Sequence, residues 1–240
     1  MYGPNSMTPT LVCIAGVASN VGKTQLVCDL LGQNPGWEAV KISKGHRRSC
    51  GKRREGCCIS PFLGDEARIL SGREETFAAG KDTGRYWEAG AGNVHWAICT
   101  NEQVEAGVIL ALHRVAAEGA FVEGTSPLKY VRFDYSVMVI SESGLDIKST
   151  AVSVMPKIDA LFVTGAEADL GVVGRFRERL RRRGTELTDV PVYFERELGR
   201  LVDEVRMVHQ RRCLYRTGQP WGGQPHVERD RQQSKEPVIG

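Results

Sequence analysis

The fold is indicated most clearly by residues 11–24, Leu-Val-Cys-Ile-Ala-Gly-Val-Ala-Ser-Asn-Val-Gly-Lys-Thr. Residues 11–15 are a short apolar run with two β-branched side chains, which is typical of a buried strand. Small residues follow from Gly16 to Gly22, and Lys23-Thr24 open a segment whose apolar residues have helical spacing. A strand, a glycine loop, Lys-Thr and a helix in this order predict a phosphate-binding loop.

Such a loop binds phosphate mainly through its backbone. Successive N–H groups and the helix N-terminus form a concave positive surface for phosphate oxygens. Lys23 is then expected to neutralise the β- and γ-phosphates, and the Thr24 hydroxyl to ligate Mg²⁺. The residues expected to bind the nucleotide are Gly16, Ser19, Asn20, Val21, Gly22, Lys23, Thr24, Gln25 and, from the next strand, Lys41.

The spacing of the two glycines departs from the usual phosphate-loop pattern. The common form has four residues between them, which would put glycine at position 17, but that residue is Val17. The first glycine is Gly16, so the motif is Gly-x5-Gly-Lys-Thr. The loop is therefore one residue longer than the standard form.

The overall composition is that of a globular protein. The chain has 240 residues, 41% hydrophobic content and a net charge of +3, which gives little support to dedicated nucleic-acid binding. No apolar run approaches the roughly 18–20 residues of a membrane span, and the polar N-terminus shows no secretory signal. Seven cysteines without such a signal indicate reduced thiols, so we expect a cytoplasmic protein.

Strand-like and helix-like segments alternate along the chain. Near-continuous apolar strands are expected at 11–15, 37–43, 94–99, 120–123, 135–141, 158–164 and 190–194. Helices are expected at 23–31, 61–71, 102–118 (with Asn101 as its cap), 169–183 and 198–208. This alternation predicts an α/β fold with a doubly wound, mostly parallel sheet of the P-loop NTPase kind. Residues 1–9 are expected to be flexible, 10–208 to form one nucleotide-binding domain, and 209–240 to be a disordered tail.

Residues 44–58 form an unusual stretch that is rich in cations and thiols. It has six Lys or Arg residues before the first acid and carries His46, Cys50, Cys57 and Cys58. Loops of this length are usually functional or disordered. Three interpretations stay open: a cationic lid over phosphates or an anionic substrate, a metal or redox site, and a solvated basic loop.

Two carboxylates are candidates for the same site. Glu123 ends an apolar strand and is followed by glycine, and strand ends of parallel sheets meet at the ligand-binding edge. Asp82 lies in a glycine-rich segment with Lys81 and Arg85 and would coordinate Mg²⁺ directly or through water. The alternatives are a helix cap for Asp82 or Thr83 and a solvated strand-end acid for Glu123.

Three separated segments together resemble the molybdopterin-guanine dinucleotide biosynthesis protein B family. They are Gly22-Lys23-Thr24, the segment Gly-Lys-Asp-Thr-Gly-Arg-Tyr-Trp-Glu-Ala-Gly-Ala at 80–91, and Val122-Glu123-Gly124. The resemblance implies a GTP-binding P-loop protein that assists molybdenum-cofactor maturation. It implies catalytic roles for Lys23, Asp82 and Glu123, and Mg²⁺ held by Thr24, Asp82 and Glu123. A molybdenum-cofactor nucleotidyltransferase and a second copy of the chain are the implied protein partners.

The chain also departs from that family. Its phosphate loop is longer, residues 41–46 replace a Lys-His-x-x-His-like stretch, and the cysteine-rich insertion is foreign to the family. No Asn-Lys-x-Asp guanine motif is present, and Thr164-Gly165-Ala166-Glu167 occupies the strand end where base contacts would lie. GTP and ATP therefore both stay open as ligands.

The longer loop is similar to that of dethiobiotin synthetase, an ATP-dependent ligase. That family shares Gly-x5-Gly-Lys-Thr, a lysine after the second strand (here Lys41) and Val-Glu-Gly (here 122–124). The resemblance implies that Lys41 binds or activates a carboxylated substrate. The leading hypothesis is thus a Mg²⁺-dependent, slow purine-nucleotide hydrolase assisting cofactor maturation. The alternatives are a ligase or kinase acting on a small anionic substrate, and a metal- or redox-sensing module built on residues 46–58.

Overall fold

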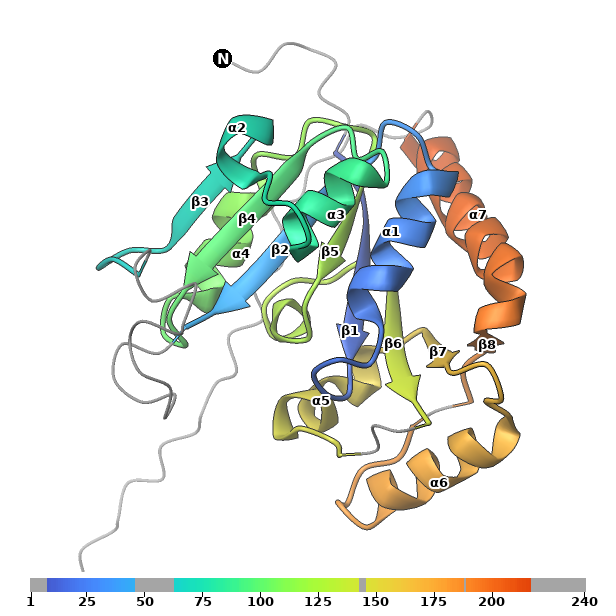
Figure 1. Ribbon diagram of the computed structural model, residues 1–240. Coiled ribbons are helices and arrows are strands. Elements are labelled where there is room, and N and C mark those ends of the chain that lie inside the picture. The colour runs from blue at the N-terminus through green and yellow to red at the C-terminus, as the bar shows by residue number, and fades with distance from the viewer. Residues whose placement is uncertain (1–7, 46–62, 143–145, 188, 217–240) are drawn as a thin grey trace, which may run out of the picture.

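The computed structural model describes residues 8–45, 63–142, 146–187 and 189–216 (Figure 1). Within these residues eight strands form one sheet in the order β3-β4-β2-β5-β1-β6-β7-β8. The strands are β1 (Thr10–Gly16), β2 (Glu38–Lys44), β3 (Arg68–Ser71), β4 (Val94–Cys99), β5 (Gly119–Glu123), β6 (Tyr135–Ser141), β7 (Ala160–Thr164) and β8 (Val192–Phe194). Every pairing is parallel except that of β3 with β4. The predicted α/β class with a mostly parallel sheet is confirmed.

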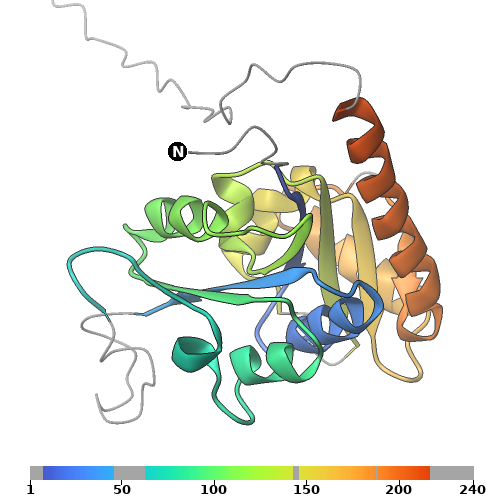
Figure 2. The ribbon, with the colours of Figure 1, turned by 90° about the horizontal axis from the view of Figure 1, so that it is seen from above.

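Helices cover both faces of this sheet. The α-helices are α1 (Lys23–Gln33), α2 (Arg73–Thr76), α3 (Asp82–Glu88), α4 (Val104–Leu112), α5 (Ser149–Val154), α6 (Leu170–Arg181) and α7 (Leu198–Arg216). Short 3-10 turns follow three of the strands or helices: η3 (Ser126–Lys129), η4 (Met155–Lys157) and η5 (Glu195–Glu197). Figure 2 shows α1 and α3 on one face and α4 on the other. Of the helices described, none has both the length and the apolar character needed to cross a membrane.

Strand β1 lies at the centre of the sheet and is almost completely buried. Its residues Val12 to Ala15 have no exposed surface, and it pairs in parallel with β5 on one side and β6 on the other. Helix α1 then packs back on the sheet through Leu26, Val27, Leu30 and Leu31. Burial of this apolar face fixes where the β1–α1 loop emerges, at the carboxyl edge of the sheet.

The final helix closes the opposite end of β1. The Thr10 hydroxyl lies 2.8 Å from Nδ1 of His209 on α7. Arg212, one turn further along α7, donates to the carboxylate of Asp134, which also accepts the Leu11 N–H at 2.8 Å. Because α7 continues to Arg216, the folded domain extends past the boundary expected at 208. The rest of the predicted tail, 217–240, lies outside the described residues.

The helix expected at 61–71 is wrong. Residues 68–71 form β3, which runs antiparallel to β4 with Arg68 opposite Ile98 and Leu70 opposite Trp96. Arg68 is exposed, Leu70 is buried, and Ile69 and Ser71 between and after them are partly buried. A run this short fits both helical and strand periodicity, and pairing with β4 decides between them.

Helix α4 is shorter at both ends than the predicted 102–118, and its N-cap is Gln103 instead of Asn101. The Gln103 side-chain oxygen accepts the Thr100 N–H at 2.9 Å. At the other end the Glu38 carboxylate accepts the N–H groups of Ala116 and Ala117, at 3.3 and 3.2 Å. These N–H groups are therefore taken by a side chain and not by a continuing helix.

Candidate functional site: the phosphate loop and the Glu123 cluster

The loop between β1 and α1 has the backbone geometry that its small residues allow. Gly22, immediately before α1, has φ 93°, in the left-handed region. A Cβ there would also lie 2.9 Å from Cγ2 of Thr164. At the start of the loop, a Cβ on Gly16 would lie 2.7 Å from Cδ of Lys23. Both glycines of the Gly-x5-Gly-Lys-Thr motif thus occupy positions where a side chain would clash.

Two threonines, one just after β5 and one at the end of β7, hold this loop by hydrogen bonds. The Thr125 hydroxyl accepts the Gly16 N–H at 3.1 Å and donates to the Gly16 carbonyl at 2.9 Å. The Thr164 hydroxyl, at the end of β7, lies 3.1 Å from the Val21 carbonyl oxygen. These contacts hold the loop at its first and last turns.

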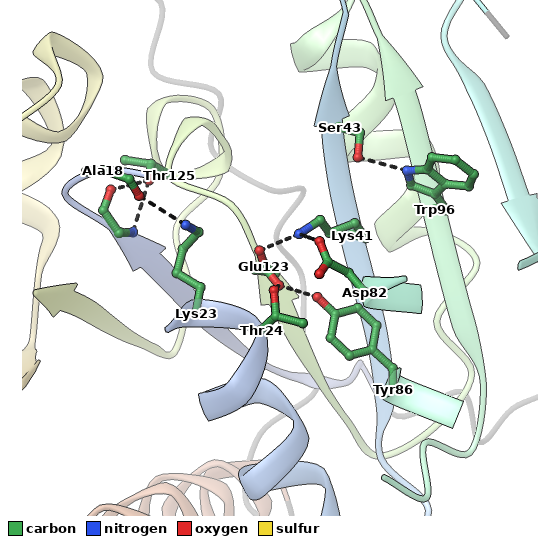
Figure 3. Close-up of polar contacts among 11 residues, drawn as sticks. Ala18, Lys23, Thr24, Lys41, Ser43, Asp82, Tyr86, Trp96, Glu123 and Thr125 are labelled. Atoms are coloured by element: carbon green, nitrogen blue, oxygen red, sulfur yellow. Dashed lines mark hydrogen bonds and ion pairs between the residues drawn. The ribbon is translucent and has the colours of Figure 1, made fainter. Parts of the chain in front are cut away.

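Lys23 lies over the loop. Its ammonium donates to the Ala18 carbonyl at 3.2 Å (Figure 3). Burial lowers the pKa of Lys23, the charges of Lys41 and Lys148 lower it further, and the nearby carboxylates oppose the change. A carbonyl oxygen is a weak partner for a cation, so an anion would bind Lys23 readily.

The Glu123 carboxylate is the centre of a compact polar cluster, which we call the Glu123 cluster: Thr24, Lys41, Asp82, Tyr86 and Glu123. Glu123 ends β5 and is 3% exposed. It accepts hydrogen bonds from the Thr24 hydroxyl at 2.9 Å, from the Lys41 ammonium and from the Tyr86 hydroxyl. Three elements, α1, β2 and α3, thus meet at one carboxylate (Figure 3). The parallel register that puts Lys41 opposite Glu123 on β2 and β5 creates this meeting.

Asp82 joins the cluster through Lys41. It is the first residue of α3, and its Oδ2 lies 2.7 Å from the Lys41 ammonium. Burial raises the pKa of Asp82, but the charge and hydrogen bond of Lys41, with smaller contributions from Thr24 and Arg85, hold the pKa below its ordinary value. Asp82 is not the N-cap of α3, which is Lys81 without a side-chain cap. Its carboxylate therefore faces the cluster as an anion.

The oxygen atoms of the cluster fit a Mg²⁺ ion. Mg²⁺ prefers carboxylate, hydroxyl, phosphate and water oxygens, and Thr24, Asp82 and Glu123 supply the first two. In the described residues no three His, Cys, Asp or Glu side chains form a metal-binding group. A metal held here would therefore rely on two carboxylates, one hydroxyl and non-protein oxygens. In this arrangement the Lys41 ammonium provides the positive charge between the carboxylates.

The other expected site residues lie around the loop. The Ser19 hydroxyl accepts a hydrogen bond from the Lys148 ammonium at 2.7 Å. Asn20 has φ 59°, in the left-handed region. The Gln25 side chain accepts from Arg85 at 2.5 Å and donates to Asp29 at 2.7 Å, on the outer side of α1. Ser19 thus contacts the residue that precedes α5, whereas Gln25 links α1 to α3.

Sequence reasoning did not identify Tyr86 or Lys148 as part of the site. Tyr86 is four residues after Asp82, a spacing that places both on one face of α3. That signal was available in the segment 80–91. No sequence signal marks Lys148, because the loop after β6 reaches the phosphate loop only through the fold.

The described residues include only the start of the cationic stretch at 44–58. Lys44 ends β2, while His46, Cys50, Cys57 and Cys58 lie outside the described residues. Burial lowers the pKa of Lys44, and the charges of Lys129 and Lys148 lower it further. The carboxyl edge of the sheet next to the loop is therefore crowded with cations.

No protein-family model matches the chain, and no curated protein does. Among solved structures, HypB from Helicobacter pylori in complex with nickel is 12% identical with a TM-score of 0.47, over 87% of this chain and 89% of that one. Zn(II)-bound YjiA GTPase from E. coli is 15% identical with a TM-score of 0.36, over 78% of this chain and 57% of that one. A plasmid partition protein from Borrelia burgdorferi is 10% identical with a TM-score of 0.30, over 78% of each chain. Structural similarity this low does not indicate which ligands the chain binds. What the structure itself shows is a mostly parallel sheet, flanked by helices, whose central strand leads into a Gly-x5-Gly-Lys-Thr loop and a helix.

Proposed function

We propose that the protein binds a purine nucleoside triphosphate together with Mg²⁺ and hydrolyses it slowly. The observation that carries the proposal is the Thr24–Glu123 contact beside the phosphate loop. It places a hydroxyl and a buried carboxylate, 2.9 Å apart, at the start of the helix that Lys23 opens. Hydroxyl and carboxylate oxygens next to a phosphate cradle form the usual setting for a Mg²⁺–nucleotide complex.

The phosphates would lie over the loop and the N-terminus of α1. Lys23 would exchange its Ala18 carbonyl partner for β- and γ-phosphate oxygens. The loop N–H groups and Ser19 would surround the same oxygens. These groups bind and orient the triphosphate without any covalent chemistry of their own.

The metal would be held by Thr24, Asp82 and Glu123. When bound, Mg²⁺ would neutralise charge on the β- and γ-phosphate oxygens. The Lys41 ammonium, now shared by Asp82 and Glu123, would then be free to turn toward the terminal phosphate. Tyr86 would keep Glu123 in place during this exchange, because its hydroxyl donates to the same carboxylate from a buried position.

Hydrolysis would proceed by attack of water on the γ-phosphorus. A new P–O bond forms and the bond from the γ-phosphorus to the β–γ bridging oxygen breaks. One proton of the water stays on the attacking oxygen and the other passes to another oxygen of the released phosphate, which loses one proton to solvent near neutral pH. The products are a nucleoside diphosphate and inorganic phosphate. The protein contributes positioning and charge neutralisation through Lys23, Asp82 and Glu123.

The test is a thermal-shift comparison of wild type, Lys23→Ala and Lys157→Ala with ATP and with GTP, each with and without Mg²⁺. Lys157 is exposed at the end of η4, so its variant is a matched loss of one lysine. Nucleotide should raise the Tm of wild type and of Lys157→Ala, and the shift should disappear in Lys23→Ala. An equal shift in Lys23→Ala, or no shift in wild type with either nucleotide, would contradict the proposal.

The cellular role we propose is assistance to molybdenum-cofactor maturation. It rests on the three segments quoted above, of which 80–91 supplies both Asp82 and Tyr86 to the Glu123 cluster. The expected behaviour is GTP preference and faster formation of molybdopterin guanine dinucleotide by a molybdenum-cofactor nucleotidyltransferase. A reconstituted assay with and without this protein measures that rate, and an unchanged rate would remove this role while leaving nucleotide binding intact.

The central position of Lys41 favours a second candidate, an ATP-dependent ligase or kinase for a small anionic substrate. A lysine that already contacts two carboxylates is well placed to receive a carboxylate substrate next to the γ-phosphate. This candidate predicts ATP preference and ADP release that depends on an added small carboxylic acid, without a protein partner. Lys41→Ala should then abolish the substrate-dependent part of ADP release.

A further inference from the structure

Lys148 is fixed to the phosphate loop by its backbone. It precedes α5, in the segment that follows β6, and its N–H donates to the Val17 carbonyl at 3.0 Å. Its own carbonyl accepts the N–H groups of Ala151 and Val152, at 2.9 and 3.2 Å, which anchors it to the start of α5. The Lys148 Cα is therefore held beside the loop although the residue is far from it in sequence.

The side chain of Lys148 also contacts the loop. Its ammonium donates to the Ser19 hydroxyl at 2.7 Å. Ser19 is three residues before Gly22, so this hydroxyl belongs to the loop that would surround the phosphates. The ammonium of Lys148 therefore lies at this loop.

Lys148 differs from Lys41 in the charge of its partners. Lys41 contacts two carboxylates, whereas no carboxylate within the described residues pairs with Lys148. Both lysines lie close enough to Lys23 to affect its titration. Positive charges that lie close together repel one another, and an anion that binds among them relieves this repulsion.

We propose that Lys148 is a further cation for the terminal phosphate, in addition to Lys23 and Lys41. On nucleotide binding its ammonium leaves the Ser19 hydroxyl and contacts γ-phosphate oxygens, on the side of the loop opposite the Glu123 cluster. In the hydrolysis described above it stabilises charge on the γ-phosphoryl oxygens and neither gains nor loses a proton. This inference rests on the proposed nucleotide binding and adds a residue that no motif of the chain indicates.

The experiment compares wild type, Lys148→Ala, Lys148→Arg and the control Lys157→Ala. Affinities are measured for the nucleoside diphosphate and for a β,γ-imido triphosphate, with Mg²⁺, and phosphate release is measured at saturating triphosphate. Lys148→Ala should lower kcat by about 10- to 100-fold and weaken triphosphate binding, while diphosphate affinity stays near that of wild type. Lys148→Arg should recover part of both losses because the positive charge is kept. Lys157→Ala should match wild type.

Several outcomes would overturn the inference. Equal losses of diphosphate and triphosphate affinity in Lys148→Ala would show that Lys148 only shapes the loop. A kcat within about twofold of wild type would show that it has no part in the reaction. Circular dichroism of each variant separates unfolding from either result. If wild type binds neither nucleotide, the proposed function itself fails. If wild type binds and hydrolyses the nucleotide, and Lys148→Ala matches wild type in triphosphate affinity and kcat, only the inference about Lys148 fails.

Discussion

Two buried glutamates lie at opposite ends of neighbouring strands, and their surroundings differ. Glu38 begins β2 and is 5% exposed, and Glu123 ends β5 and is 3% exposed. The register of the two strands places Glu38 opposite Ala120, and Lys41 opposite Glu123. Each end of this strand pair therefore carries one buried glutamate. The two glutamates differ in the groups that their carboxylates contact.

The partners of Glu38 cannot leave it. Its carboxylate accepts two backbone N–H groups and lies 2.8 Å from Nε2 of His95, which is 1% exposed. The other ring nitrogen of His95 lies 2.9 Å from the Ser71 hydroxyl, and Arg114 donates to that hydroxyl at 3.0 Å. This cluster links β2, β3, β4 and the end of α4, and each of its polar groups is satisfied by the fold.

The partners of Glu123 are side chains from three elements, and the cluster reaches solvent through Lys41 and its second partner, Asp82. Lys41 is 14% exposed, and Asp82, which shares it, is 44% exposed. A long lysine side chain can exchange one anion for another, whereas a backbone N–H cannot move away. Burial alone therefore does not distinguish the two carboxylates, and the difference lies in whether their partners can be exchanged.

The largest effect should come from Glu38→Ala. Removing this carboxylate leaves His95 and two N–H groups buried without their acceptor, so the free energy of unfolding should fall by about 3–5 kcal/mol. Urea denaturation followed by circular dichroism measures it. The folded fraction should retain its nucleotide affinity. A loss below about 1 kcal/mol would remove the distinction between the two clusters.

Glu123→Gln should reverse that pattern. The amide keeps the shape but removes the negative charge that Mg²⁺ and Lys41 need, so Mg²⁺-dependent nucleotide affinity should fall by about 10- to 100-fold. Titration calorimetry with and without Mg²⁺ measures the change. The free energy of unfolding should change less than in Glu38→Ala. Unchanged Mg²⁺ dependence would exclude Glu123 from the metal site.

Tyr86→Phe should have a smaller effect on both properties. It removes one donor to Glu123 from a side chain that is completely buried, which should cost about 1–2 kcal/mol of unfolding free energy. Nucleotide affinity should fall by less than in Glu123→Gln. Tyr130→Phe is the matched control, because the Tyr130 hydroxyl makes no hydrogen bond to any described residue. Equal melting curves for the two variants would show that Tyr86 does not position Glu123.

The smallest effect should be the pH dependence of the Asp82 contact. Its pKa in the folded protein is held below the ordinary value of 3.8, so its contribution to stability is present above pH 3.8. That contribution is lost as pH falls from this value through the folded-state pKa. The difference in unfolding free energy between wild type and Asp82→Asn should be below about 1 kcal/mol near neutral pH, because the side chain is partly exposed. It should shrink further in acid. A difference that grows in acid would show that Asp82 is not an ion-pair partner of Lys41.

The central part of the fold could be predicted from the sequence because it depends on short-range patterns. Residues 94–99 and 135–141 read as apolar strands, and the structure forms β4 and β6 over the same residues. Residues 68–71 could not be assigned in this way, because their strand form depends on a partner outside the segment. The early end of α4 also depends on a residue outside its own segment. The N–H groups of Ala116 and Ala117 donate to Glu38, which lies in a strand distant in sequence.

Some contacts of the candidate site could likewise be predicted from the sequence, and others could not. The topology of a parallel sheet places Thr24 and Glu123 on one edge, and the structure brings them into contact. The sharing of Lys41 between Asp82 and Glu123 depends on the register of β2 with β5 and on the direction of α3, neither of which composition reveals. The Lys148–Ser19 contact depends on the path of the chain after β6.

The closure of β1 by α7 bears on how the protein folds. The strand that carries the phosphate loop consists of residues 10–16, yet it pairs with residues 119–123 and 135–141 and meets α7 at His209. Contacts this distant in sequence form slowly, because the chain loses loop entropy before it gains burial. During synthesis β1 leaves the ribosome before β5, β6 and α7, so its partners are not yet available. The phosphate loop should therefore be among the last features to become ordered, and nucleotide binding would report completed folding more faithfully than helix content does.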